Sequence, residues 1–565
     1  MKIFGKYLLI PAMALGLWSC SDDAPEVNTP EESLDELYMS VKIQLPTSNG
    51  SRSVTTNPGN ASNDGTEVGK DYENKVSKVL LVLADVDDNS FISYKTIDNI
   101  SQTNTNLVVT GTFNKSVLVN YLEDKPDGWV MVYAFCNYTD ELEAHIAGRS
   151  RGDAKSLWAD EQHTIKSATD ESIWSKNNFL MANESMTKCS LPGLEAINSG
   201  LYNDKNNPYP LTGNGAVRVQ RSVARFDFMD GSDGNCTYTF AKNDEQQTIL
   251  QVQLTEMSLV NLSKSFYHLM RTSRNGLIDN YELCGKDMPT QAIEDNNMWV
   301  VDTDADRKAG IHEDVYENFF CWSGNGNQAG TWNPAAWDTW KISDVLNGDD
   351  QNFEGWNGSA NKRKGYKIWR YATENTIPAP AANQRQGITT GVIFKGMLTA
   401  TANAPQNIKE AIAAHSDLYA YKGNLYGSWD DIAEFIEELG DNTTGYTDLV
   451  ADYKNCTEAT AVSVGGFTRY QYSDADNGYP MYYPYWNRHN NNDNNSVMGH
   501  MEFQVVRNNI YKLRVTSINS LGHPVIPDDD PDPFDPEDPD EKEDVYFTVE
   551  VMILPWVVRV NDIDF

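Results

Sequence analysis

The clearest alternation of apolar and polar residues lies close to the N-terminus. Between positions 37 and 45 every odd residue is apolar, and the even residues from 38 to 44 are Tyr, Ser, Lys and Gln. Side chains of a strand point alternately to its two faces, so this segment is predicted to be a strand with one face in a core. Its core-facing residues include Met39, Val41, Ile43 and Leu45. An ordinary first strand without any special role would show the same pattern.

A second alternating segment ends the chain. It follows residues 527–539, an Asp-Pro tract that is predicted to form an extended, self-repelling spacer. Pro555 interrupts the segment, and because proline has no N–H we expect two strand halves or one bent strand. The apolar face before Pro555 consists of Phe547, Val549, Val551 and Ile553, and the face after it consists of Trp556, Val558 and Val560.

The rest of the chain is predicted to be mainly β. Short runs rich in Val, Ile, Leu, Phe and Tyr alternate with clusters of Asn, Asp, Gly and Ser. These runs are residues 76–86, 107–119, 129–136, 217–228 and 248–260. The best helix is residues 429–439, with Ser428 as N-cap and Gly440 as stop. We therefore expect β-sandwich-like domains with few short helices and long loops, and residues 298–369 as an extended insertion.

Length and charge narrow the possible functions. A chain of 565 residues is too long for one core, so two or more domains are expected. The net charge of −36 argues against nucleic-acid binding, which needs clustered Lys and Arg. Seven cysteines are present, and six remain for three disulfides if Cys20 is modified. Cys136 ends an apolar run, where a free core thiol is at least as plausible as a bridge.

The first twenty residues have the form of an export signal. Lys2 and Lys6 precede a short apolar run, which lacks the roughly 20 residues that a membrane-spanning helix needs. Residues 17–20, Leu-Trp-Ser-Cys, resemble a bacterial lipobox, in which Cys20 would be acylated and become the new N-terminus. Two or three acyl chains give stable anchoring, because each buried CH₂ contributes about 0.8 kcal/mol. A plain signal peptide with a chance cysteine is the alternative.

A cleavable loop follows the first alternating strand. Residues 47–53 are polar and contain one arginine, Arg52, which is the kind of exposed site that proteases cut. A cut between Arg52 and Ser53 would remove both the lipid anchor and a core strand. The tethered C-terminal strand could reach the exposed sheet edge of a neighbour, where main-chain hydrogen bonds give affinity. One end of the chain can thus lose a strand and the other can supply one.

Several segments of the chain form a recognisable series. The most specific part is at the C-terminus: residues 507–511 (Arg-Asn-Asn-Ile-Tyr), 521–524 (Leu-Gly-His-Pro), the Asp-Pro tract, 554–556 (Leu-Pro-Trp) and 561–565 (Asn-Asp-Ile-Asp-Phe). This series resembles the fimbrillins of the Bacteroidetes, and most closely the shaft subunit of short (minor) fimbriae. Shorter matches are residues 179–181, 221–225, 371–376, 392–396 and 482–483, of which 221–225 resembles the link between two domains. The Trp- and Asn-rich middle departs from the family pattern.

The resemblance implies a type V pilus subunit of two β-sandwich-like domains. Its organisation would be a signal peptide (1–19), a propeptide with a removable strand (20–52), an N-terminal domain (53–215), a C-terminal domain with insertions (216–526), a tether (527–544) and a donor-strand region (545–565). An outer-membrane lipoprotein precursor would be cut by an arginine-specific protease at Arg52. The expected partners are other copies of the chain, accessory tip and anchor subunits, and host glycans or proteins. The mature protein would lie in extracellular fimbriae.

Other chemistry finds little support in the sequence. The eight histidines form no close metal pair, and there is no nucleophile elbow or phosphate loop, so no enzyme, cofactor or metal site is expected. The competing hypothesis is a tip or accessory adhesin, or a glycan-binding surface lipoprotein. It rests on six tryptophans whose rings could stack on sugars or simply pack under loops. They are Trp322, Trp332, Trp337, Trp340, Trp356 and Trp369.

Overall fold

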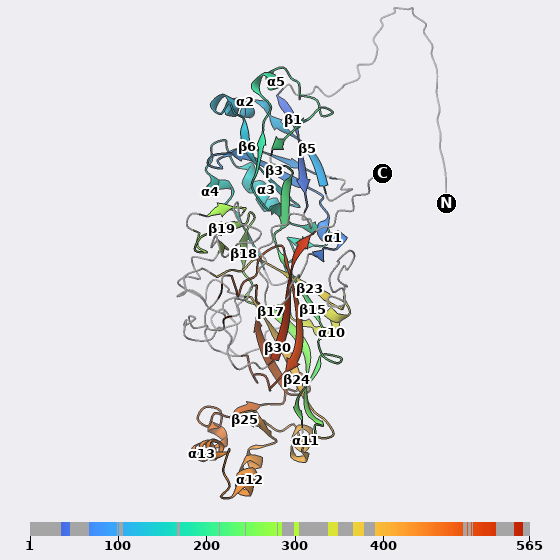
Figure 1. Cartoon of the computed structure of the whole chain (residues 1–565), viewed down its shortest axis with the longest axis vertical. Helices are drawn as coiled ribbons and strands as arrows, with labels where there is room; N and C mark the ends of the chain where they lie inside the picture. The colour runs from blue at the N-terminus through green and yellow to red at the C-terminus, as the bar shows by residue number, and fades with distance from the viewer. Residues whose placement is uncertain are drawn as a thin grey trace, which may run out of the picture.

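The computed structural model describes residues 35–45, 67–278, 281–284, 299–303, 337–348, 365–377, 390–489, 501–526 and 547–557, with short gaps at 99, 101–105, 167–169, 214 and 243–244, and also Asn494 and Gly499. The described part is elongated and mainly β, as the sequence predicts (Figure 1). A β-sheet region from the first half of the chain lies at one end, and a second β region follows it along the long axis. A small, partly helical module occupies the other end.

The N-terminal region is built on one ten-stranded sheet. Its strands are β1 (Glu36–Gln44), β3 (Val79–Asp85), β4 (Phe91–Ile97), β5 (Asn106–Asn114), β6 (Trp129–Cys136), β10 (Met181–Asn183), β11 (Thr187–Ser190), β12 (Tyr209–Pro210), β13 (Thr212–Gly213) and β14 (Val217–Arg221). The sheet is covered on both faces. Alternate residues of β3 therefore enter two different cores, with Leu81 in one and Leu80 in the other. This explains why β3 reads as a continuous apolar run.

The C-terminal region is a sandwich of two sheets. One has the order β2 (Glu67–Val68), β30 (Phe547–Val557), β29 (Asn509–Ile518), β15 (Ala224–Met229) and β23 (Lys367–Ala372). The other has the order β16 (Thr237–Lys242), β17 (Thr248–Val260), β24 (Gly391–Ala400) and β28 (Pro480–Trp486), with β22 (Trp340–Lys341) beside β17. Phe228 of the first sheet and Phe394 of the second lie 5.9 Å apart between ring centroids, so the two sheets share one core.

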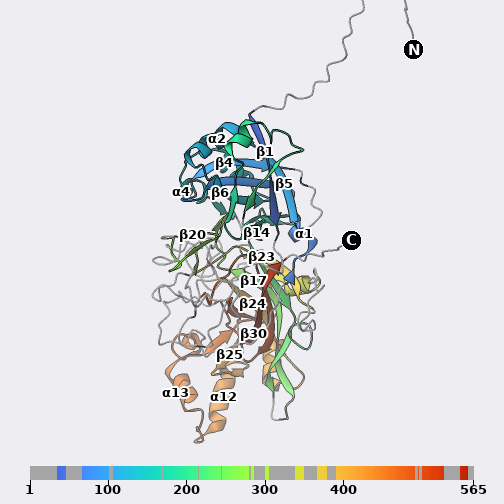
Figure 2. The same ribbon diagram turned by 45° about the horizontal axis from the view of Figure 1, so that its top comes forward.

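Short elements join and flank the two regions. Helices α2 (Lys115–Asp124), α3 (Asp140–Ala147), α4 (Lys155–Trp158) and α5 (Leu194–Asn198) flank the N-terminal sheet, and α1 (Asp71–Asn74) lies between the regions (Figure 2). The remaining short elements are β7 (Gln162–Thr164), β8 (Trp174–Ser175), β9 (Asn178–Phe179), β18 (Ser265–Tyr267), β19 (Arg271–Ser273), β20 (Glu282–Leu283), β21 (Trp299–Val300) and α10 (Ile342–Leu346). Strand β18 pairs with β7, which ties the second region to the first.

The predicted strands are found with two differences. The runs 129–136 and 248–260 are strands β6 and β17, whereas the run 107–119 is a strand only as far as Asn114. Asn114 caps helix α2 by accepting a hydrogen bond from the N–H of Val117, so the prediction of a strand through position 119 was wrong. The run 217–228 is divided into β14 and β15, which belong to different sheets. The chain thus passes from one sheet to the other between Arg221 and Ala224, a few residues beyond the expected domain limit at 215/216.

The module at the far end, here called the distal module, comprises residues 401–479. It contains α11 (Gln406–Ala413), β25 (Leu418–Tyr421), β26 (Asn424–Tyr426), α12 (Trp429–Leu439), α13 (Thr447–Asn455), the short helix η5 (Glu458–Thr460) and β27 (Thr468–Tyr470). The predicted helix 429–439 is confirmed as α12. Its N-cap Ser428 accepts a hydrogen bond from the N–H of Asp431, and Gly440 ends it with a φ of 53°.

The described cysteines and helices settle two smaller points. Cys136, Cys189, Cys236, Cys284 and Cys456 are all free thiols, so the alternative of a free core thiol at Cys136 is confirmed. Burial raises the pKa of the Cys136 thiol to about 12, which makes it a small apolar residue in practice. Among the described helices, none has the length and apolar character needed to cross a membrane.

Candidate strand-exchange site

The predicted removable strand is β1, and it lies inside the N-terminal sheet. All nine of its residues pair antiparallel with β5, from Glu36 opposite Asn114 to Gln44 opposite Asn106. On its other side β1 pairs in parallel with the short strand β12 and with the start of β14. The strand therefore has hydrogen-bonded neighbours on both sides, and its departure would leave β5 and β14 without a partner between them.

The inward face of β1 is fully buried. Leu37, Met39 and Ile43 are 0% exposed, and Val41 and Leu45 are 1% exposed. These five side chains belong to the main hydrophobic core, while the residues between them are partly or fully exposed. The alternation read from the sequence therefore corresponds to one buried and one open face. A chain segment that replaced β1 would need apolar side chains at every second position, because the vacated sites are apolar.

The predicted modification and cleavage positions lie outside the described residues. This holds for Cys20, Arg52 and Ser53. The described chain stops at Leu45, at the end of β1, and resumes at Glu67 in β2. The predicted cut between Arg52 and Ser53 thus falls on the stretch between two placed strands. A cut there would separate β1 from the rest of the chain and leave β2 and α1 with the C-terminal part.

The predicted donor strand is placed against its own chain. Strand β30 pairs antiparallel with β29, from Phe547 opposite Ile518 to Pro555 opposite Asn509. It is one strand of eleven residues that runs through Pro555, rather than two separate halves. Proline is tolerated here because β30 is near the sheet edge, where its outer side faces only the two-residue strand β2. Val558 and Val560 lie outside the described residues.

The structure does not bring the two predicted strands together. Strand β1 is inside the N-terminal sheet and β30 is in a sheet of the C-terminal region. The two strands also differ in their pairing. Strand β1 pairs along its whole length with β5 and over short stretches with β12 and β14, whereas β30 pairs along most of its length with β29. Exchange of β30 for β1 between copies of the chain stays a prediction.

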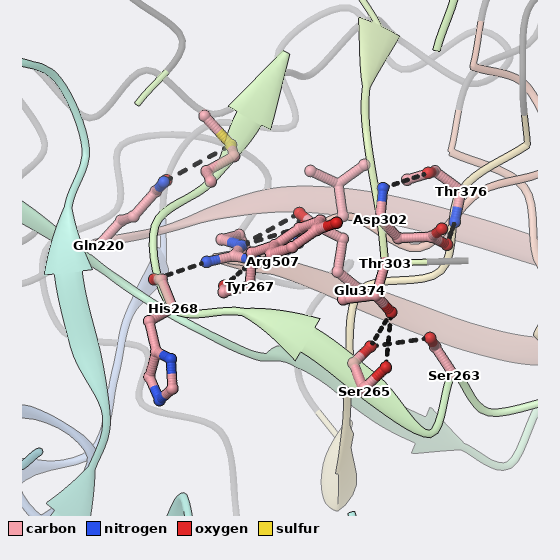
Figure 3. Close-up of polar contacts among 12 residues, drawn as sticks. Gln220, Ser263, Ser265, Tyr267, His268, Asp302, Thr303, Glu374, Thr376 and Arg507 are labelled. Carbon is pink, nitrogen blue, oxygen red and sulfur yellow. Dashed lines mark hydrogen bonds and ion pairs between the residues drawn. The ribbon is translucent and has the colours of Figure 1, made fainter. Parts of the chain in front are cut away.

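A buried ion pair fixes the start of β29, the strand that holds β30. Arg507 comes two residues before β29, and its guanidinium binds the carboxylate of Glu374 through Nε and Nη2, with Nη2 to Oε2 at 2.9 Å (Figure 3). Both side chains are 1% exposed. Nη1 also donates to the backbone carbonyl of His268, and Nη2 to that of Tyr267. The buried bidentate pair and these additional hydrogen bonds hold the backbone before β29 against the segments that carry Glu374 and Tyr267.

His268 lies beside this pair, at the contact between the two β regions. Its Nδ1–H donates to the carbonyl of Glu161 at 3.1 Å, and its ring lies edge-on to Phe135 of β6. Burial lowers the pKa of His268 to about 3, and the nearby His163 and Arg507 act in the same direction. The imidazole is therefore neutral across the physiological range.

A second buried ionic cluster joins helix α1, which follows the predicted cleavage site in the chain, to the C-terminal sheet. Arg225 of β15 binds the carboxylate of Glu73 in α1 at 3.0 Å and that of Asp227 at 3.0 Å. Lys512 of β29 lies 3.4 Å from Asp227, and the hydroxyl of Tyr371 in β23 donates to Glu73 at 2.6 Å. Glu73, Asp227 and Lys512 are 0% exposed. Such a cluster is costly to break, because removal of one charge leaves the others buried and unpaired.

Arg221 continues this cluster into the N-terminal sheet. Its Nε donates to the backbone carbonyl of Glu73, a second N–H donates to the side chain of Asn74, and its backbone N–H faces Asn508. Burial lowers the pKa of Arg221 to about 9, which still leaves it charged at neutral pH. The segment 221–225 was singled out in the sequence as a domain link, but Glu73 was not. A lone glutamate in a short polar helix carries no pattern that marks it as buried.

The tryptophans of the competing hypothesis are only partly described. Trp337 is 1% exposed and Trp369 is 3% exposed, and both pack in the interior. Trp340 is half-buried in β22, and its Nε1–H donates to Asp338. Trp322, Trp332 and Trp356 lie outside the described residues. The described members are thus packing residues in the main, since a buried ring offers no face to a sugar.

A comparison with known protein families gives a match in the C-terminal part of the chain. Residues 476–562 match the family described as major fimbrial subunit protein type IV, fimbrillin, C-terminal. The matched segment runs from β28 through β29 and the tether to β30. This match confirms, for the C-terminal part of the chain, the fimbrillin resemblance drawn from the sequence.

Solved structures of fimbrial and adhesion proteins show a broader similarity. A candidate cell adhesion protein from Parabacteroides distasonis has 12% sequence identity and a TM-score of 0.42, with 92% of this chain and 99% of that chain covered. A fimbrilin from Porphyromonas gingivalis has 12% identity and a TM-score of 0.34 over 92% and 98%. The tip fimbrial protein Mfa3 from the same species has 10% identity and a TM-score of 0.32 over 92% and 100%.

Proposed function

We propose that this fimbrillin is the polymerising shaft subunit of a cell-surface fimbria, assembled by strand exchange between copies. Proteolysis after Arg52 frees the segment that contains β1. The C-terminal strand region, residues 545–565, of another subunit then fills the vacated position. The observation that carries this proposal is the place of β1, a buried strand that is paired on both sides. The sequence that follows it, residues 46–66, contains a single arginine, Arg52. The subunit supports adhesion through the filament that it builds.

Export as a lipoprotein belongs to the same proposal. Acylation of Cys20 anchors the precursor in the outer membrane, and cleavage at Arg52 releases the mature subunit from its anchor. A shaft position is favoured over a base or tip position by the two ends of the chain. A base subunit keeps its lipid and needs no cleavable loop, whereas a tip subunit needs no tethered donor strand.

The arrangement around α1 supports a clean separation at the cut. Residues just after the loop are held by the buried Glu73–Arg225 pair and by Arg221. The segment before the loop has no such ionic anchor among the described residues, since β1 is held by backbone pairing and apolar burial. Cleavage therefore separates β1 from the chain, while α1 and the residues after the cut stay fixed to the C-terminal region.

The proposal is tested by the N-terminus of protein sheared from cells and by the variant Arg52→Ala. We expect wild-type filaments to begin at Ser53 and the variant to accumulate as a folded, surface-exposed precursor monomer. The matched control is Lys70→Ala, a basic residue on the other side of the loop whose loss should leave assembly normal. Filaments that begin at an acylated Cys20, or long filaments of Arg52→Ala, would contradict the proposed maturation.

A further inference from the structure

We propose that the distal module, residues 401–479, is the contact surface that each subunit presents to the N-terminal region of the next copy in the filament. This inference rests on the proposed strand exchange and adds the second point of contact between subunits. Its partner is a second copy of the same chain.

The distal module is an insertion that the sandwich itself does not require. Strands β24 and β28 flank it in sequence and pair directly with each other, from Gly391 opposite Trp486 to Met397 opposite Pro480. A short turn after residue 400 would be enough to connect them. The module instead has a core of its own, with Tyr419, Tyr421, Ile432, Leu449 and Phe467 among its buried residues. It projects from the end of the molecule opposite the N-terminal sheet (Figures 1 and 2).

The tether to the predicted donor strand begins beside this module. The hydroxyl of Tyr470 in β27 donates to the carbonyl of Gly522 at 2.8 Å, and His523 forms a bridge with Tyr482 of β28. The last described residue before the tether is Ile526, and β30 begins opposite Ile518, at the same end of β29. The donor segment of a subunit therefore leaves from the pole that carries the distal module.

The direction of β1 determines which end of the next subunit meets that pole. Strand β1 begins beside α2 and α5, at the outer end of the N-terminal region, and ends near β14 at the junction of the two regions. A donor that takes the place of β1 with the same direction must enter at the outer end. Its tether precedes it in the chain, so the tether also arrives there. The distal module of one copy then faces the outer end of the next copy.

The length of the tether is consistent with this approach. Residues 527–546 connect the last placed residue of the sandwich to β30, and an extended Pro-rich chain spans about 3.1 Å per residue. Twenty residues therefore reach roughly 60 Å, which is enough to pass a small module and enter a neighbouring sheet. A flexible tether limits the distance between two subunits, but it does not fix their relative orientation. A second contact is what would fix the two subunits relative to each other.

The two facing ends carry exposed apolar side chains. In the distal module, Val462 and Val464 are 56% and 60% exposed, on a loop between η5 and β27. At the outer end of the N-terminal region, Leu201 is 51% exposed, and its neighbour Tyr202 accepts a hydrogen bond from the backbone N–H of Tyr38 at the start of β1. The exposed leucine is thus next in sequence to a residue that is hydrogen-bonded to the start of β1.

The charge distribution favours the loop of residues 459–468 as the contact with the next copy. The distal module has thirteen acidic residues against four basic ones, and acidic surfaces repel an acidic partner. The stretch from Ala459 to Thr468 contains no charged residue. A contact through this loop buries apolar surface without bringing like charges together, and burial of apolar surface favours association.

The test compares the double variant Val462→Asp, Val464→Asp with Leu157→Asp, which places a charge at a similarly exposed residue of α4 on the flank of the N-terminal region. Matured subunits are assembled in vitro, and filament length and the critical concentration are measured beside the thermal transition of the monomer. We expect the double variant to raise the critical concentration by roughly tenfold with an unchanged thermal transition. Leu157→Asp should assemble as the wild type does. Equal assembly of the double variant and the wild type, or equal loss in both variants, would overturn the proposal.

A peptide experiment separates failure of this contact from failure of strand exchange. A synthetic peptide of residues 545–565 is added to matured subunits that lack their own residues 545–565, with and without the valine substitutions. We expect the peptide to bind both with the same affinity, because the loop does not line the groove. Loss of peptide binding in the valine variant would show that the substitutions act on the groove and would contradict a separate contact. Absence of peptide binding in both would instead refute the proposed exchange.

Discussion

Strands β1 and β30 are similar in sequence pattern but differ in how the fold holds them. Both alternate, and both form a long antiparallel ladder with one neighbour. Strand β1 has partners on both sides and five side chains in the main core, whereas β30 has one long partner and the two-residue β2 at its outer side. A strand that is paired on both sides is expected to be harder to remove, because its departure breaks two sets of backbone hydrogen bonds. A strand near an edge can be lost and replaced at lower cost, because the next ladder position remains open to pairing.

The largest effect is expected from a charge in the donor region. Val558→Asp, or removal of residues 556–565, should abolish assembly, because an inserted donor would bury an unpaired charge or lack half of its apolar positions. Cleaved subunits should still fold and keep their thermal transition, since residues 547–555 supply the ladder to β29. Electron microscopy beside a melting curve provides the measurement. Unfolding of the truncated monomer would mean that these residues complete their own domain.

Next in size is the effect of a cavity under β1. Ile43→Ala should destabilise the precursor by about 2–5 kcal/mol, because the side chain is fully buried and the core cannot close around the gap. Filaments assembled from the cleaved variant should have the stability of the wild type, because the altered residue has left with the propeptide. Denaturant unfolding of precursor and filament gives the comparison. A matching loss in both forms would show that β1 stays in place after cleavage.

A smaller effect, the loss of stability at acid pH caused by His268, should be common to the precursor and the matured protein. The pKa of His268 is about 3 in the folded state, against an ordinary value of 6.5. Below pH 6.5 His268 binds a proton in the unfolded chain but stays neutral in the folded chain. The free energy of unfolding is therefore unaffected by this group above pH 6.5 and falls by about 1.4 kcal/mol for each pH unit below it. We expect His268→Phe to flatten this slope between pH 6.5 and 4.5 in both forms. An unchanged slope would assign the acid sensitivity to other groups.

The smallest effect is expected in the tether. Asp532→Asn and Asp535→Asn, separately or together, should leave filament length and monomer stability unchanged, because this tract has to provide only reach and solubility. They serve as the charge-altering control for the donor variants. A strong loss of assembly here would mean that the tether makes specific contacts with the neighbouring subunit.

The sequence by itself determined the elements with a strong local signal. The alternation at positions 37–45 predicted both the strand and its buried face, and the capping residues Ser428 and Gly440 predicted the limits of α12. The five alternate apolar residues of β1 can be read without any knowledge of the partners, because a strand with one buried face imposes a period of two. The C-terminal motif series also indicated the fimbrillin resemblance, and the fimbrillin family model matches the same part of the chain.

Only the tertiary structure decided where those elements pair and what joins them. No local pattern shows that β1 lies between β5 and β14, or that β30 runs through Pro555 along β29. The helix α2 was missed because Asn114 acts as a cap, a role that depends on the geometry of the preceding strand. Glu73 was missed for a related reason, since its partners Arg225 and Tyr371 lie about 150 and 300 residues away in the chain. Pairing and buried charge are properties of residues brought together across long stretches of sequence, and their energies exist only once the fold has formed.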